Sequence, residues 1–256
     1  MNLSFVPLLQ VQRDLYAMPR GLARFREYLR TMVDAATGDL ALPLVAMNPM
    51  GRDHVPALID AYLALDAEGI AADAVADAAR IVEPDSPNPA QYKVGLVVSD
   101  DLKGAWTNRY ASDFAHRFES APLERRGWLV GLLWTSEPAS EVAVRDAVLT
   151  SIYRAHHLQT HPIPTTLGEM LAQEGYATAQ AGCIGPAPDK DDLEYTRGVL
   201  ASHLQATDRA TVIGCLYGDA GANALGYPPQ GLSDRAGFAL ALHDAHVPRR
   251  DSRFKT

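Results

Sequence analysis

The chain has 256 residues, a net charge of −8 and an apolar content of 47%. This length suits one α/β domain, so we expect a single domain over residues 1–256, with a weak boundary in the proline-rich segment 83–90. An acidic chain repels a phosphate backbone, which argues against nucleic acid as a partner. Two cysteines, the lack of a signal-peptide pattern and the lack of a long apolar run together predict a cytoplasmic protein without a membrane partner.

The first third of the chain predicts helices and one weak strand. Residues 20–36 carry apolar side chains at helical spacing. Residues 40–47 form a short apolar run that we expect to be an edge strand, because Pro43 suits an edge position. Helices should follow from Asp53, which can act as an N-cap, to about Ile81.

The remainder of the chain alternates stronger strand and helix patterns. Three almost wholly apolar runs, 92–98, 128–134 and 211–217, are typical of strands buried on both faces of a sheet. Thr166 and Glu169 match a capping box, which predicts a helix start. Helical patterns cover residues 109–118, 140–155, 167–181, 191–204 and 234–245. The sequence therefore predicts an α/β fold with a mostly parallel, doubly wound sheet of about four to five strands covered by helices.

The strongest enzyme motifs are absent from the sequence. It contains no G-x-G-x-x-G, no G-x-x-x-x-G-K-[ST] and no G-x-S-x-G, so a dinucleotide fingerprint, a P-loop and a nucleophile elbow are not indicated. It also contains neither C-x-x-C nor H-E-x-x-H, which excludes zinc sites of those kinds. The sequence does not identify a cofactor, and a divalent metal ion stays a candidate.

Each expected strand is followed by a polar segment. These segments begin at Asn48, Ser99, Thr135 and Gly218. In a parallel sheet the carboxyl ends of the strands meet at one rim, where ligands bind. Helix capping and turn formation are the alternative explanation for each segment. The segment 99–109 favours a functional role, because it combines acids, cations and an aromatic side chain around a glycine.

These segments supply the candidate site residues. Four acids could act as general acids or bases or bind a hard divalent ion: Asp100, Asp101, Glu137 and Asp219. Six side chains are candidates for substrate binding: Asn48, Lys103, Trp106, Asn108, Arg109 and Ser136. Among these, Lys103 and Arg109 would hold an anionic substrate group, and Trp106 would stack on it.

Two histidines are a weaker metal candidate. His157 and His161 are four residues apart, so they would share one face if the helix from Ser140 persists that far. Pro162 argues against this, because it disfavours helical geometry at the preceding residue. Histidines near a helix C-terminus also complement its dipole without any metal.

The sequence is compatible with two functional classes. The first is a small-molecule enzyme, most simply a hydrolase or group-transfer enzyme with an acidic, metal-assisted site at the strand ends. The second is a non-catalytic protein that uses the same rim to bind a metabolite, a peptide or a partner chain. The sequence leaves open the substrate, the reaction, whether the protein is an enzyme at all, and the oligomeric state.

Overall fold

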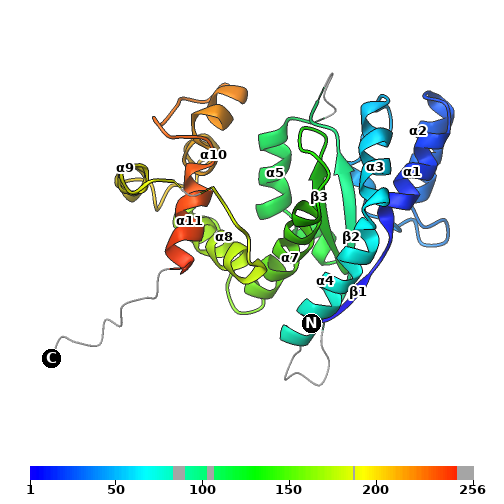
Figure 1. Ribbon diagram of the computed structural model, residues 1–256, viewed down its shortest axis with the longest axis horizontal. Coiled ribbons are helices and arrows are strands. Elements are labelled where there is room, and N and C mark those ends of the chain that lie inside the picture. Colours follow the sequence, from blue (N-terminus) through cyan, green and yellow to red (C-terminus); the bar gives the residue numbers. More distant parts are fainter. Residues whose placement is uncertain (83–89, 103–106, 187, 247–256) are drawn as a thin grey trace. The chain divides into compact units, whose positions relative to one another are not determined.

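The computed structural model describes residues 1–82, 90–102, 107–186 and 188–246 (Figure 1). The chain divides into two compact units, Met1–Thr160 and His161–Thr256. Most of the segment 83–90, where the sequence indicated a weak boundary, lies outside the described residues. The expectation of one domain over the whole chain stays a prediction.

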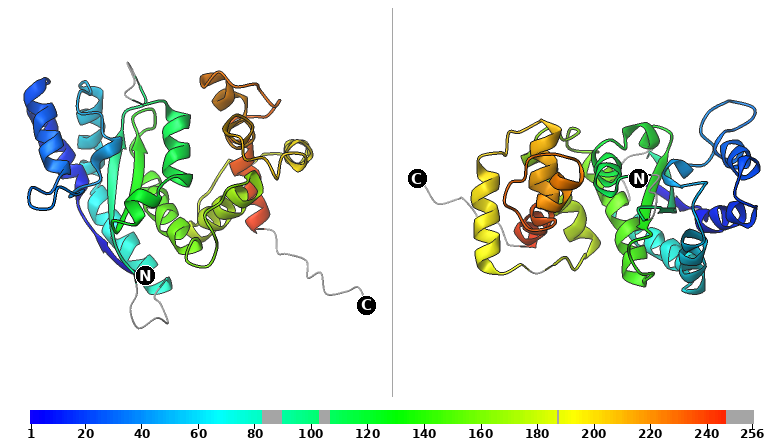
Figure 2. Two further views of the ribbon diagram at one scale, coloured as in Figure 1. Left: turned by 180° about the vertical axis from the view of Figure 1, so that it is seen from behind. Right: turned by 90° about the horizontal axis from the view of Figure 1, so that it is seen from above.

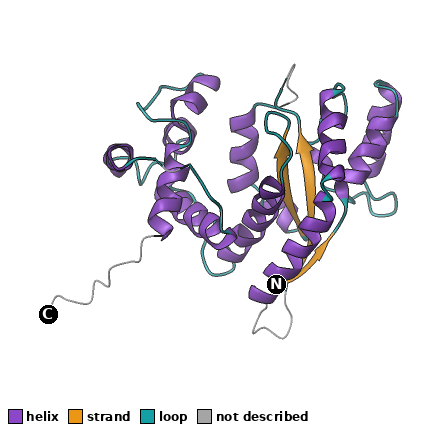
Figure 3. Ribbon diagram, viewed as in Figure 1, coloured by secondary structure: helices purple, strands orange, loops and turns teal. Residues whose placement is uncertain are grey.

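The first unit contains a small parallel sheet. Its strands are β1 (Asn2–Phe5), β2 (Gln91–Ser99) and β3 (Trp128–Trp134), in the order β1-β2-β3 (Figure 3). β2 and β3 confirm two of the predicted strands, whereas β1 was not predicted. The architecture is a mixture of helices and sheet, and the described part of the chain holds three strands rather than the expected four to five.

Helices cover both faces of this sheet. The described helices of the first unit are α1 (Leu8–Ala17), α2 (Leu22–Met32), the 3₁₀ helix η1 (Leu44–Ala46), α3 (His54–Ala64), α4 (Ala67–Ile81), α5 (Arg109–Phe118), α6 (Ala121–Glu124) and α7 (Glu141–His157). α4 and α7 pack against each other and against β1 and β3, respectively (Figure 2). α1 packs against β2 and α3.

Two glycines show that α1 and α7 lie on opposite faces. A Cβ on Gly131 of β3 would meet the backbone of Ala147 in α7 at 2.9 Å, and a Cβ on Gly95 of β2 would clash with the side chain of Leu8 in α1. Gly131 pairs with Leu96, the neighbour of Gly95, and successive strand residues point to opposite faces. Both glycines therefore let a helix approach the sheet closely, one from each side.

The short strand β1 leaves part of β2 without a neighbouring strand. β1 ends at Phe5, whereas β2 continues to Ser99. The amide of Gln12, which is completely buried, occupies this edge. Its Nε2 donates to the carbonyl of Val98 at 3.1 Å, and its Oε1 accepts from the Val98 N–H at 2.9 Å. One side chain thus replaces the backbone of a missing strand, because buried backbone groups must be paired.

The predicted edge strand at residues 40–47 was wrong. Leu40 forms only an isolated bridge with Val33, and the chain then turns into η1 after Pro43. Pro43 has no N–H to donate to a ladder, so the apolar run buries Leu44 and Met47 without pairing as a strand.

Helices are the only secondary structure among the described residues of the second unit, and loops join them. Its helices are α8 (Leu167–Ala181), α9 (Lys190–Ala201), α10 (Arg209–Ala224) and α11 (Ala236–His246). The predicted capping box at the start of α8 is confirmed, with Thr166 and Glu169 each bonding the other's backbone. In the part of the chain that the structure describes, no helix combines the length and apolarity needed to cross a bilayer.

The predicted strand at residues 211–217 was also wrong, because this run forms the first half of α10. Asp208 caps the helix by accepting from the Thr211 N–H at 2.9 Å. Residues Val212–Gly218 are all buried, and a helix buried on all sides has the same continuous apolar pattern as a buried strand. Gly218, with φ of 70°, then kinks the helix.

We predict that Gln12→Ala destabilises the first unit by about 1–3 kcal/mol, because it leaves the buried Val98 N–H and carbonyl without partners. Urea denaturation measures this change. Gln10→Ala, at an exposed position of the same helix, is the matched control and should stay within about 0.5 kcal/mol of the wild type. Equal stability of the two variants would contradict the role assigned to Gln12.

Candidate functional site

Several polar side chains meet at the carboxyl ends of β2 and β3. Asp100 and Asp101 directly follow β2, and Thr135 and Ser136 directly follow β3 (Figure 1). The segment before α3 and the first residue of α3 join them, because Asn48 and His54 bond to Asp100. The sequence had placed these segments at one rim. The parallel pairing of β2 with β3 brings two of them together, and the contacts of Asn48 and His54 with Asp100 add the third.

Asp100 is the centre of this cluster, although only 1% of it is exposed. Its Oδ2 accepts from the Asn48 Nδ2 at 2.8 Å, and its Oδ1 lies 2.8 Å from the His54 Nε2. The N–H of Leu102 also donates to Oδ1, at 3.2 Å. A buried carboxylate needs such donors, since burial of an unpaired charge is very costly. Hydrogen bonds therefore fix the Asp100 carboxylate in place, and the carboxylate in turn orients Asn48 and His54.

Asn48 is held in its turn by the backbone and by α1. Its Oδ1 accepts from the Met50 N–H at 3.0 Å, and its carbonyl accepts from the Tyr16 hydroxyl. Burial, together with the charge of Asp100, raises the pKa of Tyr16 well above its usual value, so the hydroxyl remains a neutral donor. The Asn48 amide therefore has little freedom to turn away from Asp100.

His54, the first residue of α3, contributes an imidazole ring to the cluster. Its side chain is 20% exposed, whereas the carboxylate it contacts is buried. When Nε2 carries the proton and donates to Asp100, Nδ1 is left as a proton acceptor. A carboxylate in this position also stabilises the imidazolium that forms when the ring takes up a second proton.

Asp101 is bound mainly by the segment after β3. Its Oδ1 accepts from the Ser136 N–H at 2.9 Å, and its Oδ2 accepts from the Ser136 hydroxyl at 2.6 Å. Burial raises the pKa of Asp101, but hydrogen bonds from Ser136, Thr135 and Arg109 outweigh it and leave the pKa below the usual value. Asp101 is consequently ionised. Its lowered pKa and the hydrogen bonds that both of its oxygens accept make it a weak general base.

Arg109, at the start of α5, is neutralised within the cluster. Its guanidinium donates to Asp101 at 3.2 Å and to Glu137 at 2.6 Å. It also lies over the ring of Trp134, 4.1 Å from the centroid. Two carboxylates therefore already pair with one guanidinium, which conflicts with the predicted role of Arg109 as the holder of an anionic substrate group.

Three other predicted substrate-binding residues are Asn108, Lys103 and Trp106. Asn108 caps α5, since its Oδ1 accepts from the N–H groups of Tyr110 and Ala111 at 3.0 and 3.1 Å. This supports the capping alternative. Lys103 and Trp106 lie outside the described residues.

Asp219 has a structural role in the second unit. Its Oδ1 accepts from the N–H groups of Gln230, Gly231 and Leu232 at 2.8, 2.9 and 3.2 Å. Asp219 was expected at the rim because residues 211–217 were predicted to be a strand, but that segment is helical. Its assignment as a catalytic acid has no geometric basis.

The histidine pair does not share a helix. α7 ends at His157, so His161 lies beyond it, as Pro162 had suggested. Among the described residues, no group of three or more His, Cys, Asp or Glu side chains is arranged to hold a metal ion.

Sequence reasoning did not select His54 or Tyr16. His54 stood in the polar segment that begins at Asn48, but nothing in that segment distinguishes it from a solvent-exposed histidine. The distinguishing signal is the buried carboxylate 46 residues away.

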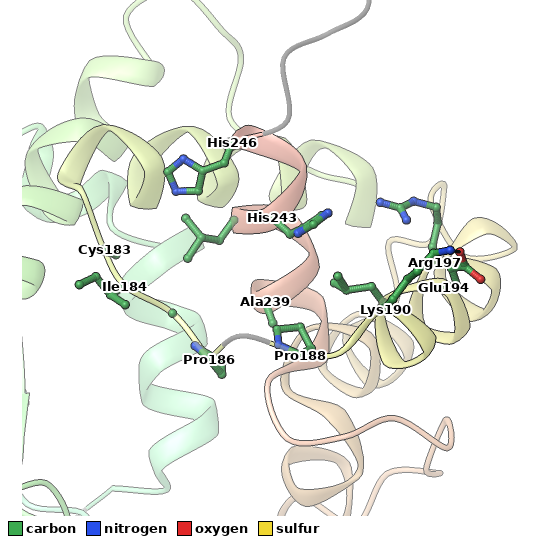
Figure 4. A pocket seen from close by; sticks show the side chains of 13 residues that line it. Cys183, Ile184, Pro186, Pro188, Lys190, Glu194, Arg197, Ala239, His243 and His246 are labelled. Carbon is green, nitrogen blue, oxygen red and sulfur yellow. Dashed lines mark ion pairs between the residues drawn. The ribbon is translucent and has the colours of Figure 1, made fainter.

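A separate cavity of about 700 Å³ lies in the second unit. Residues 183–186 and 188 line it together with α9 and α11 (Figure 4). Its walls are largely apolar, and its cations Lys190 and Arg197 pair with Glu194 and Asp244. It holds no counterpart of the His54–Asp100 pair, so the cluster in the first unit is the better candidate for chemistry.

Comparison with known proteins adds one short similarity. The chain is similar to the uncharacterized protein YjfC of Bacillus subtilis (strain 168), with 34% identity over 77 residues. This match covers 30% of the chain and spans about a quarter (26%) of YjfC. No family model matches the chain, and no solved structure matches it.

We predict that Asp101→Asn lowers the free energy of unfolding near pH 7 by about 1.5–3 kcal/mol, because hydrogen bonds to a charged acceptor are lost. The folded-state pKa of Asp101 lies below its usual 3.8. Its stabilisation is therefore fully present above that value and is lost as the pH falls through the folded pKa. Denaturation with urea near pH 7 and near pH 3 measures both effects.

The matched control for this measurement is Asp73→Asn, at an exposed position of α4. It should change stability by less than about 0.5 kcal/mol at either pH. A difference between wild type and Asp101→Asn that is equally large at both pH values would show that the lost charge is not its cause.

Proposed function

We propose that this protein is a small-molecule enzyme in which His54 transfers protons and Asp100 orients it. The observation that carries the proposal is the 2.8 Å contact between the His54 Nε2 and the Oδ1 of a carboxylate that is 1% exposed. Asn48 fixes the other oxygen of that carboxylate. A fixed acid–imidazole pair with a partly exposed ring is the arrangement that general acid–base catalysis requires.

The chemistry fits a hydrolase or a group-transfer enzyme. The His54 Nδ1 would accept a proton from the attacking group, which is water in hydrolysis or a hydroxyl in group transfer. The imidazolium formed in this step would be stabilised by Asp100 and would then return the proton to the leaving group. Asp100 would keep its charge throughout, because its role is to orient the ring and to compensate its charge.

The charges around His54 favour a neutral or cationic substrate. Among the described residues of the cluster, the three carboxylates of Asp100, Asp101 and Glu137 outnumber the one guanidinium of Arg109, and the Glu137 side chain is 48% exposed. An anionic group approaching this surface would be repelled. The substrate class therefore differs from the anion expected when Arg109 and Lys103 were considered alone. Metal assistance is not part of the proposal.

A non-catalytic binding protein is the second candidate. One observation favours it: both buried carboxylates, Asp100 and Asp101, already accept hydrogen bonds at each oxygen. Such a saturated cluster could serve as a rigid rim that binds a metabolite, a peptide or a partner chain. In either case we propose a protein of the cytoplasm that does not bind nucleic acid.

Substitution of His54 tests the enzyme. In a screen against neutral and cationic esters, amides and phosphodiesters, His54→Gln should lower any turnover by about 10²–10⁴-fold, the usual contribution of a general acid–base group. Asp100→Asn should lower turnover in the same substrates. His203→Gln, in the second unit, is the matched control and should leave turnover unchanged.

The result of this screen separates the two candidates. Full turnover by His54→Gln would falsify the proposed catalytic role. A ligand that raises the melting temperature of the wild type but not of His54→Gln, without turnover, would favour the binding protein.

The orientation of His54 can be measured without a substrate. At a pH where the ring is neutral, nitrogen NMR should show the proton on Nε2 in the wild type, because Asp100 accepts from that atom. In Asp100→Asn this preference should be lost, since the new amide can donate to Nε2. The proton resting on Nδ1 in the wild type would contradict the proposed geometry.

A further inference from the structure

One side of α2 is apolar and exposed. Leu22 and Leu29, seven residues apart, are 67% and 42% exposed, and Val33, directly after the helix, is 45% exposed. A spacing of seven residues places two side chains on the same side of a helix. The opposite side buries Arg24 and Tyr28. α2 lies beside α1 at the edge of the first unit and packs against it (Figures 1 and 2). We call Leu22, Leu29 and Val33 the α2 stripe.

Arginines lie within and beside the α2 stripe, since Arg26 falls between Leu22 and Leu29 on the same side of the helix. Arg20, Arg26 and Arg30 are all exposed. The segment 20–33 contains four arginines and a single acid, Glu27, which pairs with Arg30. This is the reverse of the chain as a whole, whose net charge is −8. A basic helix with an exposed apolar side is the pattern of helices that lie in a membrane interface.

From this arrangement, we propose that α2 binds the surface of an anionic lipid bilayer. The α2 stripe would enter the boundary between headgroups and acyl chains, and the three exposed arginines would contact acidic headgroups. Repulsion from the acids elsewhere in the chain falls off beyond ~8 Å at physiological salt, so the local charge decides the contact. This inference is independent of the proposed function and departs from the expectation, drawn from composition, of no membrane partner.

A second copy of the chain fits the stripe less well. Three partly exposed side chains cover much less than the ~800 Å² per partner that a stable interface buries. A two-fold pairing of α2 would also bring the arginines of both copies together, and like charges repel. Anionic lipid instead complements both features of the surface, its apolar side chains and its positive charge.

Sedimentation of the full chain with vesicles tests the proposal. Binding to vesicles of mixed phosphatidylserine and phosphatidylcholine should be at least ~10-fold stronger than binding to phosphatidylcholine alone and should weaken with added salt. Leu22→Asp/Leu29→Asp should lower binding to the anionic vesicles at least ~10-fold, and Arg26→Glu/Arg30→Glu should do the same.

Matched controls use exposed residues of the first unit outside α2. Val142→Asp, at a position that is 59% exposed, and Arg145→Glu should leave vesicle binding unchanged. Unchanged circular dichroism confirms that each variant is folded. Absence of vesicle binding, or binding that the α2 variants do not weaken, overturns the proposal. A dimer in solution that Leu22→Asp/Leu29→Asp dissociates, without vesicle binding, overturns it in favour of self-association.

Discussion

The burial of the Asp100 carboxylate at the end of β2 organises the candidate site. A charge that is 1% exposed must be compensated, and the donors come from segments far apart in the chain. Asn48 lies in the segment before α3, His54 is the first residue of α3, and Leu102 follows the strand itself. The need to pair one carboxylate therefore anchors that segment to the sheet and holds the His54 ring in place.

Helix α1 connects this site to the edge of the sheet. Gln12 and Tyr16 are four residues apart and so lie on one face of α1. Gln12 pairs with the Val98 backbone in β2, whereas the Tyr16 hydroxyl bonds to the carbonyl of Asn48. A single helical face thus completes the short sheet and supports the residue that holds Asp100. The stability of the fold and the geometry of the site depend on the same contacts.

The predicted site residues come together only in part, and their roles differ from those expected. Asn48, Asp100, Asp101, Arg109, Ser136 and Glu137 form one cluster. Within it, Asp101 and Arg109 form an ion pair, so the candidate for proton transfer is His54. Residue type and position along the chain predicted that three segments, those beginning at Asn48, Ser99 and Thr135, would meet. The reactivity of each group depends on its partners, which come from different segments.

The sequence by itself determined β2, β3, the capping box at Thr166 and the polar segments at the strand ends, because these depend on residues close together in the chain. The tertiary structure alone decided that 211–217 is a helix, because complete burial erases the difference between helical and strand periodicity. It also decided the pairing of His54 with Asp100, 46 residues apart. Such a contact depends on how the elements pack, and local sequence patterns do not indicate it.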